Sequence, residues 1–332
     1  MNILVTGAAG FIGSNFVHLY LSKFPDHKVV IIDSMTYAGD MENLRGIENK
    51  ISFYSGCIGD KTLVDKILAE HKIDHIYNFA AESHVDNSIS NPGVFLETNI
   101  MATFRLLQSC RKYYESLLDK SKFKFLHVST DEVYGSLAFD DVEIFSEETT
   151  YKPNSPYSAS KAASDHLVRS FIHTYNLPCV TTNCSNNYGK RQNIEKLIPK
   201  TIMACINKNN IPVYGNGLQI RDWIWVDDHC NGIILAMQNG KIGETYCFGG
   251  DCETKNIDII NKICDIMNRI LPIEIDYKNL ITFVQDRAGH DVRYAISSEK
   301  AKQELGFKHY GTLLENLEET IRFYMDKNSL NK

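Results

Sequence analysis

The sequence has no Cys-x-x-Cys pair, no apolar run approaching twenty residues and no excess of basic residues. Its nine cysteines are scattered and odd in number, which favours reduced thiols over a disulfide framework or a zinc site. A membrane-spanning helix needs about twenty consecutive apolar residues, so none is expected. The net charge of −6 argues against a nucleic-acid-binding surface. We therefore predict no metal site, no membrane partner and no nucleic-acid partner.

The N-terminus leaves no room for a secretory leader, because an apolar run that reads as a strand begins at Asn2. Together with the reduced thiols, this predicts a cytoplasmic protein. A chain of 332 residues is long enough for one large α/β domain and a substantial second lobe. Internal repeats and low-complexity tracts are not apparent, so the composition is that of an ordinary globular protein.

Short apolar runs alternate with helical patterns from residue 2 to about residue 183. The strands are expected at Ile3–Thr6, Lys28–Ile32, Ile51–Tyr54, His75–Phe79, Lys124–Ser129 and Val180–Asn183. The helices between them are expected at Thr62–His71, Asn99–Leu118 and Tyr157–Tyr175. This alternation is typical of a Rossmann-type, doubly wound parallel sheet, so the fold class is α/β and the first domain spans residues 1–183.

Beyond residue 184 the alternation is less regular and loops are longer. Strands are expected at Ile211–Tyr214, Trp223–Val226 and Glu244–Phe248, and helices at Asn256–Ile270 and Thr312–Met325. We interpret residues 184–332 as a smaller, mixed α/β substrate lobe, with elements from about 220–250 returning to the first domain.

A glycine-rich turn follows the first expected strand and opens a helical pattern. In Thr6–Gly13, three glycines allow a tight turn, close approach to a pyrophosphate and close helix packing. Asp33 ends the second strand twenty residues after Gly13, where a carboxylate can bind both ribose hydroxyls and would repel a 2′-phosphate. The pattern predicts an NAD site and disfavours NADP. A glycine-rich turn beside an unrelated surface aspartate is the structural alternative.

Two further groups of polar residues point to chemistry. Tyr157 and Lys161 are spaced i, i+4 and share a helix face, where an ammonium can lower the pKa of a phenol. Asp131 and Glu132 follow the strand expected to end beside the nicotinamide, with Thr130 before them. An adjacent acid and base can remove a proton and expel a leaving group. A solvated helix face and a solvated turn are the respective structural alternatives.

The sequence resembles the extended short-chain dehydrogenases/reductases, and within them the dTDP-glucose 4,6-dehydratase family. The resemblance covers nearly the whole chain. Its motifs are Thr6–Gly13, Asp33–Gly39, Ala80–Asp86, Ser129–Gly135, Ser155–Lys161, Asn183–Gly189, Glu195–Pro199, Gln219–Trp223 and Asp286–Asp291. The Asp131–Glu132 pair is the specific part, because related sugar epimerases usually lack both acids and nucleotide-sugar decarboxylases tend to keep only the glutamate.

The resemblance implies a role for each catalytic residue. Tyr157, assisted by Thr130 and Lys161, takes the proton of the glucose C4 hydroxyl while hydride passes to NAD. Glu132 then removes the C5 proton, and Asp131 protonates the departing C6 hydroxyl, so that water leaves. The hydride returns to C6 and C5 is reprotonated. NAD ends as it began, so we expect it to stay bound between turnovers.

Binding residues are also implied by the resemblance. Those expected around the cofactor are Gly7, Gly10, Phe11, Ile12, Gly13, Asp33, Ser34, Thr36, Ala38, Gly39, Cys57, Ile58, Phe79, Ala80, Ala81, Ser83, Thr98, Ser129, Tyr157, Lys161 and Asn186. Those expected around the nucleotide sugar are Ser83, His84, Thr130, Asn187, Glu195, Lys196, Leu197, Pro212, Tyr214, Arg221, Asn256, Arg287 and His290.

The chain departs from the family pattern at two places. Cys57 stands where the family usually has an aspartate that binds adenine, so adenine anchoring is expected to be weaker or to use the backbone. The segment 190–194 replaces a Pro- and Phe-containing segment near the nucleotide, which leaves thymine and uracil both open. The two bases differ by one methyl group, worth only about 1–3 kcal/mol to a pocket.

Three other functions stay open: a UDP-glucose 4,6-dehydratase of a UDP-rhamnose-type pathway, an NDP-sugar 4-epimerase, and a non-enzymatic NAD-binding scaffold. By resemblance, the Asn99–Leu118 and Tyr157–Tyr175 helices are expected to form a four-helix bundle in a homodimer. The apolar positions compatible with this interface are Ile100, Phe104, Leu107, Leu167 and Phe171. The alternative is that these side chains only pack onto the sheet.

Overall fold

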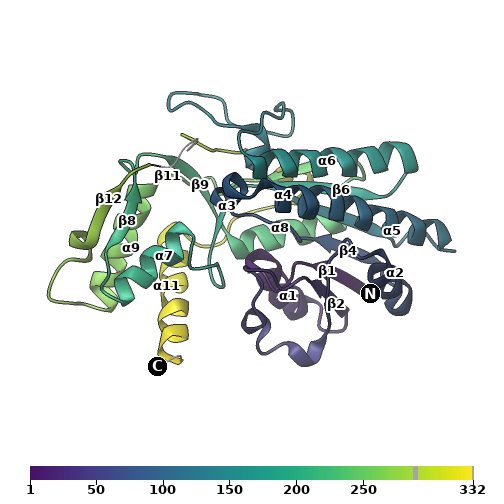
Figure 1. Ribbon diagram of the computed structural model, residues 1–332, viewed down its shortest axis with the longest axis horizontal. Helices are drawn as coiled ribbons and strands as arrows, with labels where there is room; N and C mark the ends of the chain where they lie inside the picture. The colour runs from purple at the N-terminus through teal and green to yellow at the C-terminus, as the bar shows by residue number, and fades with distance from the viewer. Residues whose placement is uncertain (287–290, 331–332) are drawn as a thin grey trace.

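The structure, a computed structural model, describes residues 1–286 and 291–330 and consists of a larger and a smaller part (Figure 1). The larger part contains a seven-stranded, entirely parallel sheet in the order β10-β6-β5-β4-β1-β2-β3. Its strands are β1 (Asn2–Thr6), β2 (Lys28–Asp33), β3 (Ile51–Ser55), β4 (His75–Asn78), β5 (Lys124–Thr130), β6 (Cys179–Cys184) and β10 (Thr245–Phe248). The predicted doubly wound parallel sheet is confirmed, and its expected strands differ from these only at their ends.

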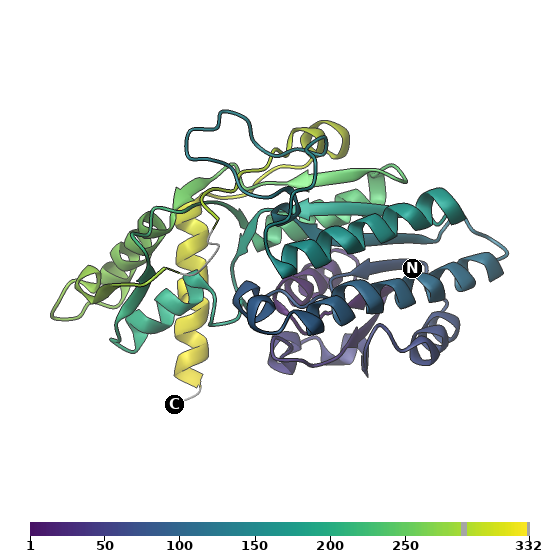
Figure 2. The same cartoon turned by 45° about the horizontal axis from the view of Figure 1, so that its top comes forward.

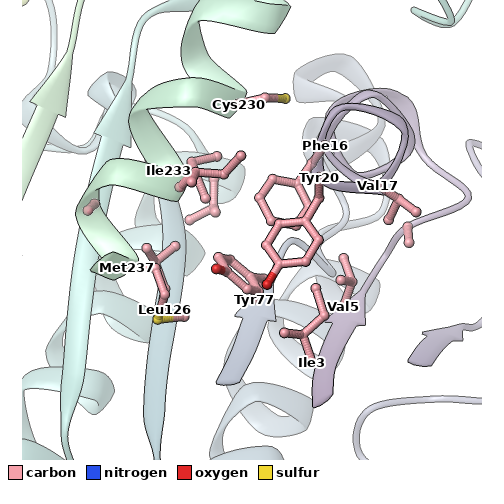
Figure 3. Packing of buried hydrophobic residues seen from close by; sticks show 14 of the residues in the cluster. Ile3, Val5, Phe16, Val17, Tyr20, Tyr77, Leu126, Cys230, Ile233 and Met237 are labelled. Atoms are coloured by element: carbon pink, nitrogen blue, oxygen red, sulfur yellow. The ribbon is translucent and has the colours of Figure 1, made fainter. Parts of the chain in front are cut away.

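Both faces of the sheet are covered by helices, which is why its strands read as continuous apolar runs. One face carries α1 (Phe11–Lys23), α8 (Val226–Asn239) and α10 (Glu299–Leu305), and the other carries α2 (Lys61–His71), α5 (Thr103–Ser116) and α6 (Pro156–Tyr175). Side chains alternate along β1, so Ile3 and Val5 enter one core while Leu4 enters the other. Figure 3 shows the first core, where the rings of Phe16 and Tyr77 lie with centroids 4.5 Å apart.

The two helices expected at the dimer face begin differently. Helix α6 starts with a capping box between Ser155 and Ser158 and has Pro156 in its first turn. The expected Asn99 start is too late, because α4 (Pro92–Phe95) and a π-helical turn, η3 (Leu96–Ala102), run directly into α5. The short helix α3 (Val85–Ser90) precedes them. A π-helical turn places one extra residue in the helix, and such turns are frequent at functional sites.

The smaller part is mixed, as the less regular sequence pattern indicates. Strands β7 (Asn186–Tyr188), β9 (Ile220–Trp225) and β11 (Glu253–Lys255) form one sheet, and β8 (Ile211–Tyr214) pairs in parallel with β12 (Ile281–Val284). Helices α7 (Leu197–Ile206), α9 (Asn256–Ile270) and α11 (Leu313–Leu330) enclose a separate apolar core with them. The remaining short helices are η1 (Met41–Leu44), η2 (Glu48–Lys50), η4 (Asp131–Tyr134) and η5 (Tyr277–Leu280). The expected strand Trp223–Val226 begins earlier, at Ile220, and Val226 already belongs to α8.

The chain passes from the larger part to the smaller one and back. After β9, helix α8 covers the large sheet and β10 pairs with β6 as its edge strand. A later segment returns as well, because Ala301, Leu305 and Phe307 join the core between α1, α8 and the sheet. In the view of Figure 2, the yellow α11 lies wholly on the side of the smaller part. Within the described residues, no helix combines the length and apolar character that crossing a membrane requires.

Candidate active site

A cavity of about 670 Å³ lies where the carboxyl ends of the large sheet's strands meet the smaller part. Its size is that of a typical small-molecule site, and its position is the one where open α/β sheets bind ligands. Every residue predicted to bind the cofactor lines this cavity, and so do Thr130, Asp131, Glu132, Tyr157 and Lys161. The fold therefore brings residues from eight separate sequence segments to one cavity.

The glycine-rich turn after β1 forms the floor of the cavity. Gly7 has φ +67°, and a Cβ there would lie 2.8 Å from the backbone of Ala80. A Cβ on Gly13 would lie 2.5 Å from the Gly7 carbonyl oxygen. Helix α1 begins directly afterwards, and no side chain caps its N-terminus at Gly10. This backbone suits an anionic group such as a diphosphate, which gains from free N–H groups and the helix dipole.

Asp33 is held at the end of β2 with its carboxylate facing the cavity. Its Oδ2 accepts a hydrogen bond from the Ala9 amide (2.8 Å), and its Oδ1 accepts one from the Met35 amide (2.9 Å). Each carboxylate oxygen retains a lone pair, so both can still accept from ribose hydroxyls. Cys57 lines the same end of the cavity, where its sulfur accepts from the Gly59 amide (3.3 Å).

The π-helical turn η3 positions one wall of the cavity. The Asn99 side chain accepts from the Glu82 amide (2.9 Å) and donates to the Glu82 carbonyl (3.0 Å) and to Ser160 Oγ (2.8 Å). It thereby fixes the segment that follows β4, including Ala80 and Ser83. Burial raises the pKa of Glu82, which also lines the cavity. The sequence analysis did not assign Glu82, although it belongs to the quoted motif Ala80–Asp86.

Tyr157 and Lys161 lie on the buried face of α6, so the solvated-face alternative is wrong. Burial raises the pKa of Tyr157 well above its ordinary value, with Glu132 adding to the effect and a hydrogen bond with Thr130 opposing it. Lys161 donates to the Val128 carbonyl (2.9 Å), and burial lowers its pKa. The lowering of the phenol pKa expected from this spacing is therefore outweighed by desolvation.

A buried network that the sequence analysis missed lies behind these two residues. Asp165 accepts from Ser129 Oγ (2.8 Å) and from the Tyr151 hydroxyl (3.0 Å), and His127 Nε2 lies 3.3 Å from its other oxygen. Asp165 also raises the pKa of Lys161, against the effect of burial. The sequence spacing could have indicated Asp165. It follows Lys161 by four residues, as Lys161 follows Tyr157, so the three side chains share one helix face.

The acid pair lies directly after β5, on the short helix η4. Asp131 is 1% exposed, and burial raises its pKa well above the ordinary value, with Glu132 and Asp222 contributing. Thr130 donates to its Oδ1 (3.2 Å), and its Oδ2 has no hydrogen-bond partner among the described residues. A raised pKa favours the protonated carboxyl of Asp131, the form that can donate a proton, and the neighbouring Glu132 also lines the cavity. A solvated turn is excluded.

Part of the predicted nucleotide-sugar site joins the same cavity. Ser83, Asn187, Glu195 and Lys196 line it, and the Lys196 ammonium lies 3.4 Å from the Ser83 carbonyl oxygen. His84 does not line the cavity but stands behind it, with its Nε2 3.5 Å from a Glu195 carboxylate oxygen.

The other predicted substrate residues do not line this cavity, and their part in substrate binding stays a prediction. They are Leu197, Pro212, Tyr214, Arg221 and Asn256. All five belong to α7, β8, β9 and α9 of the smaller part. Arg221 is buried, donates to the Ile220 and Asp291 carbonyls, and stacks on Tyr294. Arg287 and His290 lie outside the described residues.

Several lining residues carried no prediction. They include Tyr37, Asp40, Asn43, Cys184, Ser185, Arg191, Gln192, Asn193, Ile194, Met203, Tyr324, Lys327 and Asn328. Burial, with Glu195 and Glu82, raises the pKa of Tyr37 to about 12. The segment 190–194 was noted only as a departure from the family pattern, and nothing in the amphipathic sequence of α11 marks its last turn as part of a site. Across residues 1–286 and 291–330, no three His, Cys, Asp or Glu side chains are grouped to hold a metal ion.

Comparison with known proteins agrees with this geometry. The family model described as GDP-mannose 4,6 dehydratase matches residues 4–320. A dTDP-glucose 4,6-dehydratase of Xanthomonas campestris pv. campestris is 49% identical over 329 residues, which cover 97% of this chain and 92% of that relative.

Solved structures similar to this chain also include dTDP-glucose 4,6-dehydratases. The dTDP-glucose 4,6-dehydratase DesIV of Streptomyces venezuelae, crystallised with NAD, has a TM-score of 0.90 and 38% identity, covering 99% of this chain and 98% of its own. The dTDP-glucose 4,6-dehydratase of Bacillus anthracis, in complex with NAD, has a TM-score of 0.88 and 39% identity over the same shares. A UDP-glucose 4-epimerase of Thermotoga maritima has a TM-score of 0.87 and 26% identity, covering 99% of this chain and 100% of its own. The fold alone therefore does not separate dehydratase from epimerase.

Proposed function

The chain belongs to the dTDP-glucose 4,6-dehydratase family, and from that premise we propose that it converts dTDP-glucose to the 4-keto-6-deoxy-glucose nucleotide and water, with NAD recycled. The observation that carries the proposal is the buried Asp131 beside Glu132, in the same cavity as Tyr157, with the pKa of Asp131 raised by burial. A 4-epimerase needs the tyrosine but neither acid, and a scaffold protein needs none of the three.

Each step assigns one task to one side chain. Tyr157 takes the proton of the C4 hydroxyl, and Thr130, hydrogen-bonded to it, orients that hydroxyl. When bound, NAD accepts the hydride of C4 and returns it at C6, and its cationic ring favours the ionised form of Tyr157. Glu132 removes the C5 proton, made acidic by the C4 ketone, and later returns it. Asp131 supplies its proton to the C6 hydroxyl, which leaves as water.

The cavity fits NAD in three respects. The glycine turn leaves room for a diphosphate, Asp33 is held for a ribose, and Tyr157 and Lys161 stand at the opposite end, beside the acid pair. Because NAD is neither consumed nor exchanged in the reaction, we propose that it stays bound between turnovers. The relatives named above favour thymine as the substrate base, and the UDP-glucose dehydratase is the second candidate because segment 190–194 departs from the family pattern.

We further propose a cytoplasmic homodimer that pairs through α5 and α6. Of the five apolar positions expected at this interface, Leu107 and Phe171 are buried in the core beneath these helices, so they pack onto the sheet instead. Ile100, Phe104 and Leu167 are only partly buried and remain available, and Leu96 and Met101 are exposed on the preceding turn. Light scattering in solution measures the mass and tests the dimer.

The activity test supplies dTDP-glucose and UDP-glucose separately to the purified protein, without added cofactor, and follows the products by mass spectrometry. We expect loss of one water from dTDP-glucose, and slower or no loss from UDP-glucose. If the mass is unchanged, the assay is repeated with added NAD, because Cys57 replaces a residue expected to anchor adenine. An unchanged mass with an altered sugar configuration by NMR would replace this proposal by the epimerase.

A further inference from the structure

Two cations that the sequence analysis did not assign line the cavity. Arg191 lies in the segment 190–194, and Lys327 lies in the last turns of α11. The first lies in the loop that connects β7 with α7, and the second more than 130 residues further along the chain. Their convergence on one rim of the cavity is therefore a property of the fold.

Arg191 is held against the helix that starts at the glycine turn. Its guanidinium donates to Asn15 Oδ1 (2.9 Å), and the Asn15 amide donates back to the Lys190 carbonyl (2.8 Å). Asn15 lies four residues, about one turn, after Phe11, the first residue of α1, so the guanidinium is placed close to the turn that suits a diphosphate. Arg191 adopts φ +67°, an unfavourable backbone conformation that the surrounding contacts maintain.

Arg191 forms no ion pair with a described carboxylate, although the more distant Asp227 acts to raise its pKa against the effect of burial. Its neighbour Lys190 differs, because the Lys190 ammonium lies 2.5 Å from Glu319 and 3.8 Å from Asp227, and it does not line the cavity. Burial lowers the pKa of Arg191, so its charge is partly desolvated. A half-buried guanidinium with unused N–H donors beside a glycine turn is suited to bidentate binding of phosphate oxygens.

Helix α11 completes the same rim. The Tyr324 hydroxyl donates to the Gln192 carbonyl, which ties α11 to segment 190–194. The Lys327 ammonium lies 3.7 Å from Asp40, whose amide donates to the Ala9 carbonyl of the glycine turn (3.1 Å). This ion pair is long and partly exposed, so it holds Lys327 only weakly and leaves its charge available to a ligand.

We propose that Arg191 and Lys327 form a cationic cover over the diphosphate of NAD and slow its release. The inference rests on the proposed function, which requires a cofactor that is retained between turnovers. NAD and a nucleotide sugar both carry a diphosphate. We assign the cover to NAD because Asn15 and Asp40, the partners of the two cations, lie on the segments that surround the glycine turn.

The test measures NAD release from the purified holoenzyme. Bound NAD is quantified per chain, and its dissociation rate is followed after dilution by an enzymatic assay of free NAD. For Arg191→Gln and Lys327→Gln, we expect release to be faster by about tenfold each, the size of one lost charge-assisted hydrogen bond. Their release should also respond less to added salt, because one cation fewer is screened.

Two matched variants control for the loss of charge itself. Lys190→Gln removes the adjacent cation, which is paired outside the cavity, and Arg322→Gln removes a cation of α11 that pairs with Glu318. Both should release NAD at the rate of the unaltered protein. Equal acceleration in the controls, or no acceleration in Arg191→Gln and Lys327→Gln, would overturn the proposal. Lys327, at a partly exposed site, keeps the test decisive if Arg191→Gln does not fold.

A second arm separates the two diphosphates. The affinity of the holoenzyme for dTDP, measured by calorimetry, should be the same in all four variants. If dTDP affinity falls while NAD release is unchanged, the cover belongs to the substrate and the assignment to NAD is wrong. Faster NAD release in a protein that fails to dehydrate dTDP-glucose would uphold this inference and reject the proposed function.

Discussion

The ends of β1 and β5 lie at the same edge of one sheet, separated only by β4, yet they are built in opposite ways. After β1, three glycines remove side chains from a turn that then opens α1. After β5, Thr130, Asp131 and Glu132 follow one another, and two of the three are buried. The first strand end presents backbone to a ligand, and the second presents ionisable side chains.

The difference shows what each kind of site demands. A phosphate must approach backbone N–H groups closely, which requires a tight turn. At Gly7 and Gly13 this turn leaves no room for a Cβ, because other backbone atoms already occupy the space. Proton transfer needs side chains whose pKa values differ from those in water. At the end of β5, burial removes the carboxyl group of Asp131 from water and so shifts its pKa. The raised pKa of Asp131 is the measurable sign of that lost hydration.

The largest effect is expected from changing the base at the β5 end. Glu132→Gln should leave oxidation at C4 possible but slow the loss of water about 10³-fold, within the range for removal of a general base. Reduced nicotinamide should then accumulate on the protein, which its ultraviolet absorbance reports, while mass spectrometry measures water loss. The exposed Glu143→Gln is the matched control. Unimpaired water loss in Glu132→Gln would show that another group takes the C5 proton.

The β1 end is tested by adding one methyl group. Gly7→Ala should lower the free energy of unfolding by about 3 kcal/mol and yield protein without bound NAD, because the new Cβ overlaps the Ala80 backbone. Gly46 also has positive φ (+87°) but open space around it, so Gly46→Ala should cost only about 1 kcal/mol and keep NAD. Urea unfolding and NAD content give both quantities. Equal costs would mean that backbone conformation, and not close approach, explains Gly7.

The smallest effect concerns pH and the acid at the β5 end. A carboxyl whose pKa is raised by folding loses stability as pH rises from the ordinary aspartate value through the raised one. Asparagine does not titrate, so Asp131→Asn should gain stability relative to the unaltered protein as pH rises above the ordinary aspartate pKa, by about 1.4 kcal/mol for each pH unit until the raised pKa is reached. A stability difference independent of pH would show that Asp131 is ionised in the folded protein.

The strand-end sites were predictable because topology alone determines them. In a parallel sheet the carboxyl ends share one edge, so Gly7, Asp33 and Asp131 had to meet once the alternation was recognised. The helix face of Tyr157 and Lys161 followed from a four-residue spacing. The same reasoning would have reached Asp165, had the spacing been continued by one more turn.

The smaller part offered no such rule. Its strands are three to six residues long and belong to two small sheets, so no single edge gathers their side chains. Arg221 and Asn256 lie outside the cavity. Lys327, near the end of α11, lines it, although no sequence motif indicated this. The opposing effect of burial on Tyr157 was also beyond the sequence, because desolvation depends on contacts between elements distant along the chain.

The position of β10 has a consequence for synthesis on the ribosome. Strand β6 is buried along its whole length and lies between β5 and β10. Strand β10 is synthesised some sixty residues after β6. A nascent chain that ends before residue 245 leaves the backbone of β6 unpaired on the side that β10 later occupies, and such an open edge can pair with other chains. Until then, a chaperone or the unfinished smaller part has to shield that edge, and a fragment cut after residue 183 is expected to aggregate.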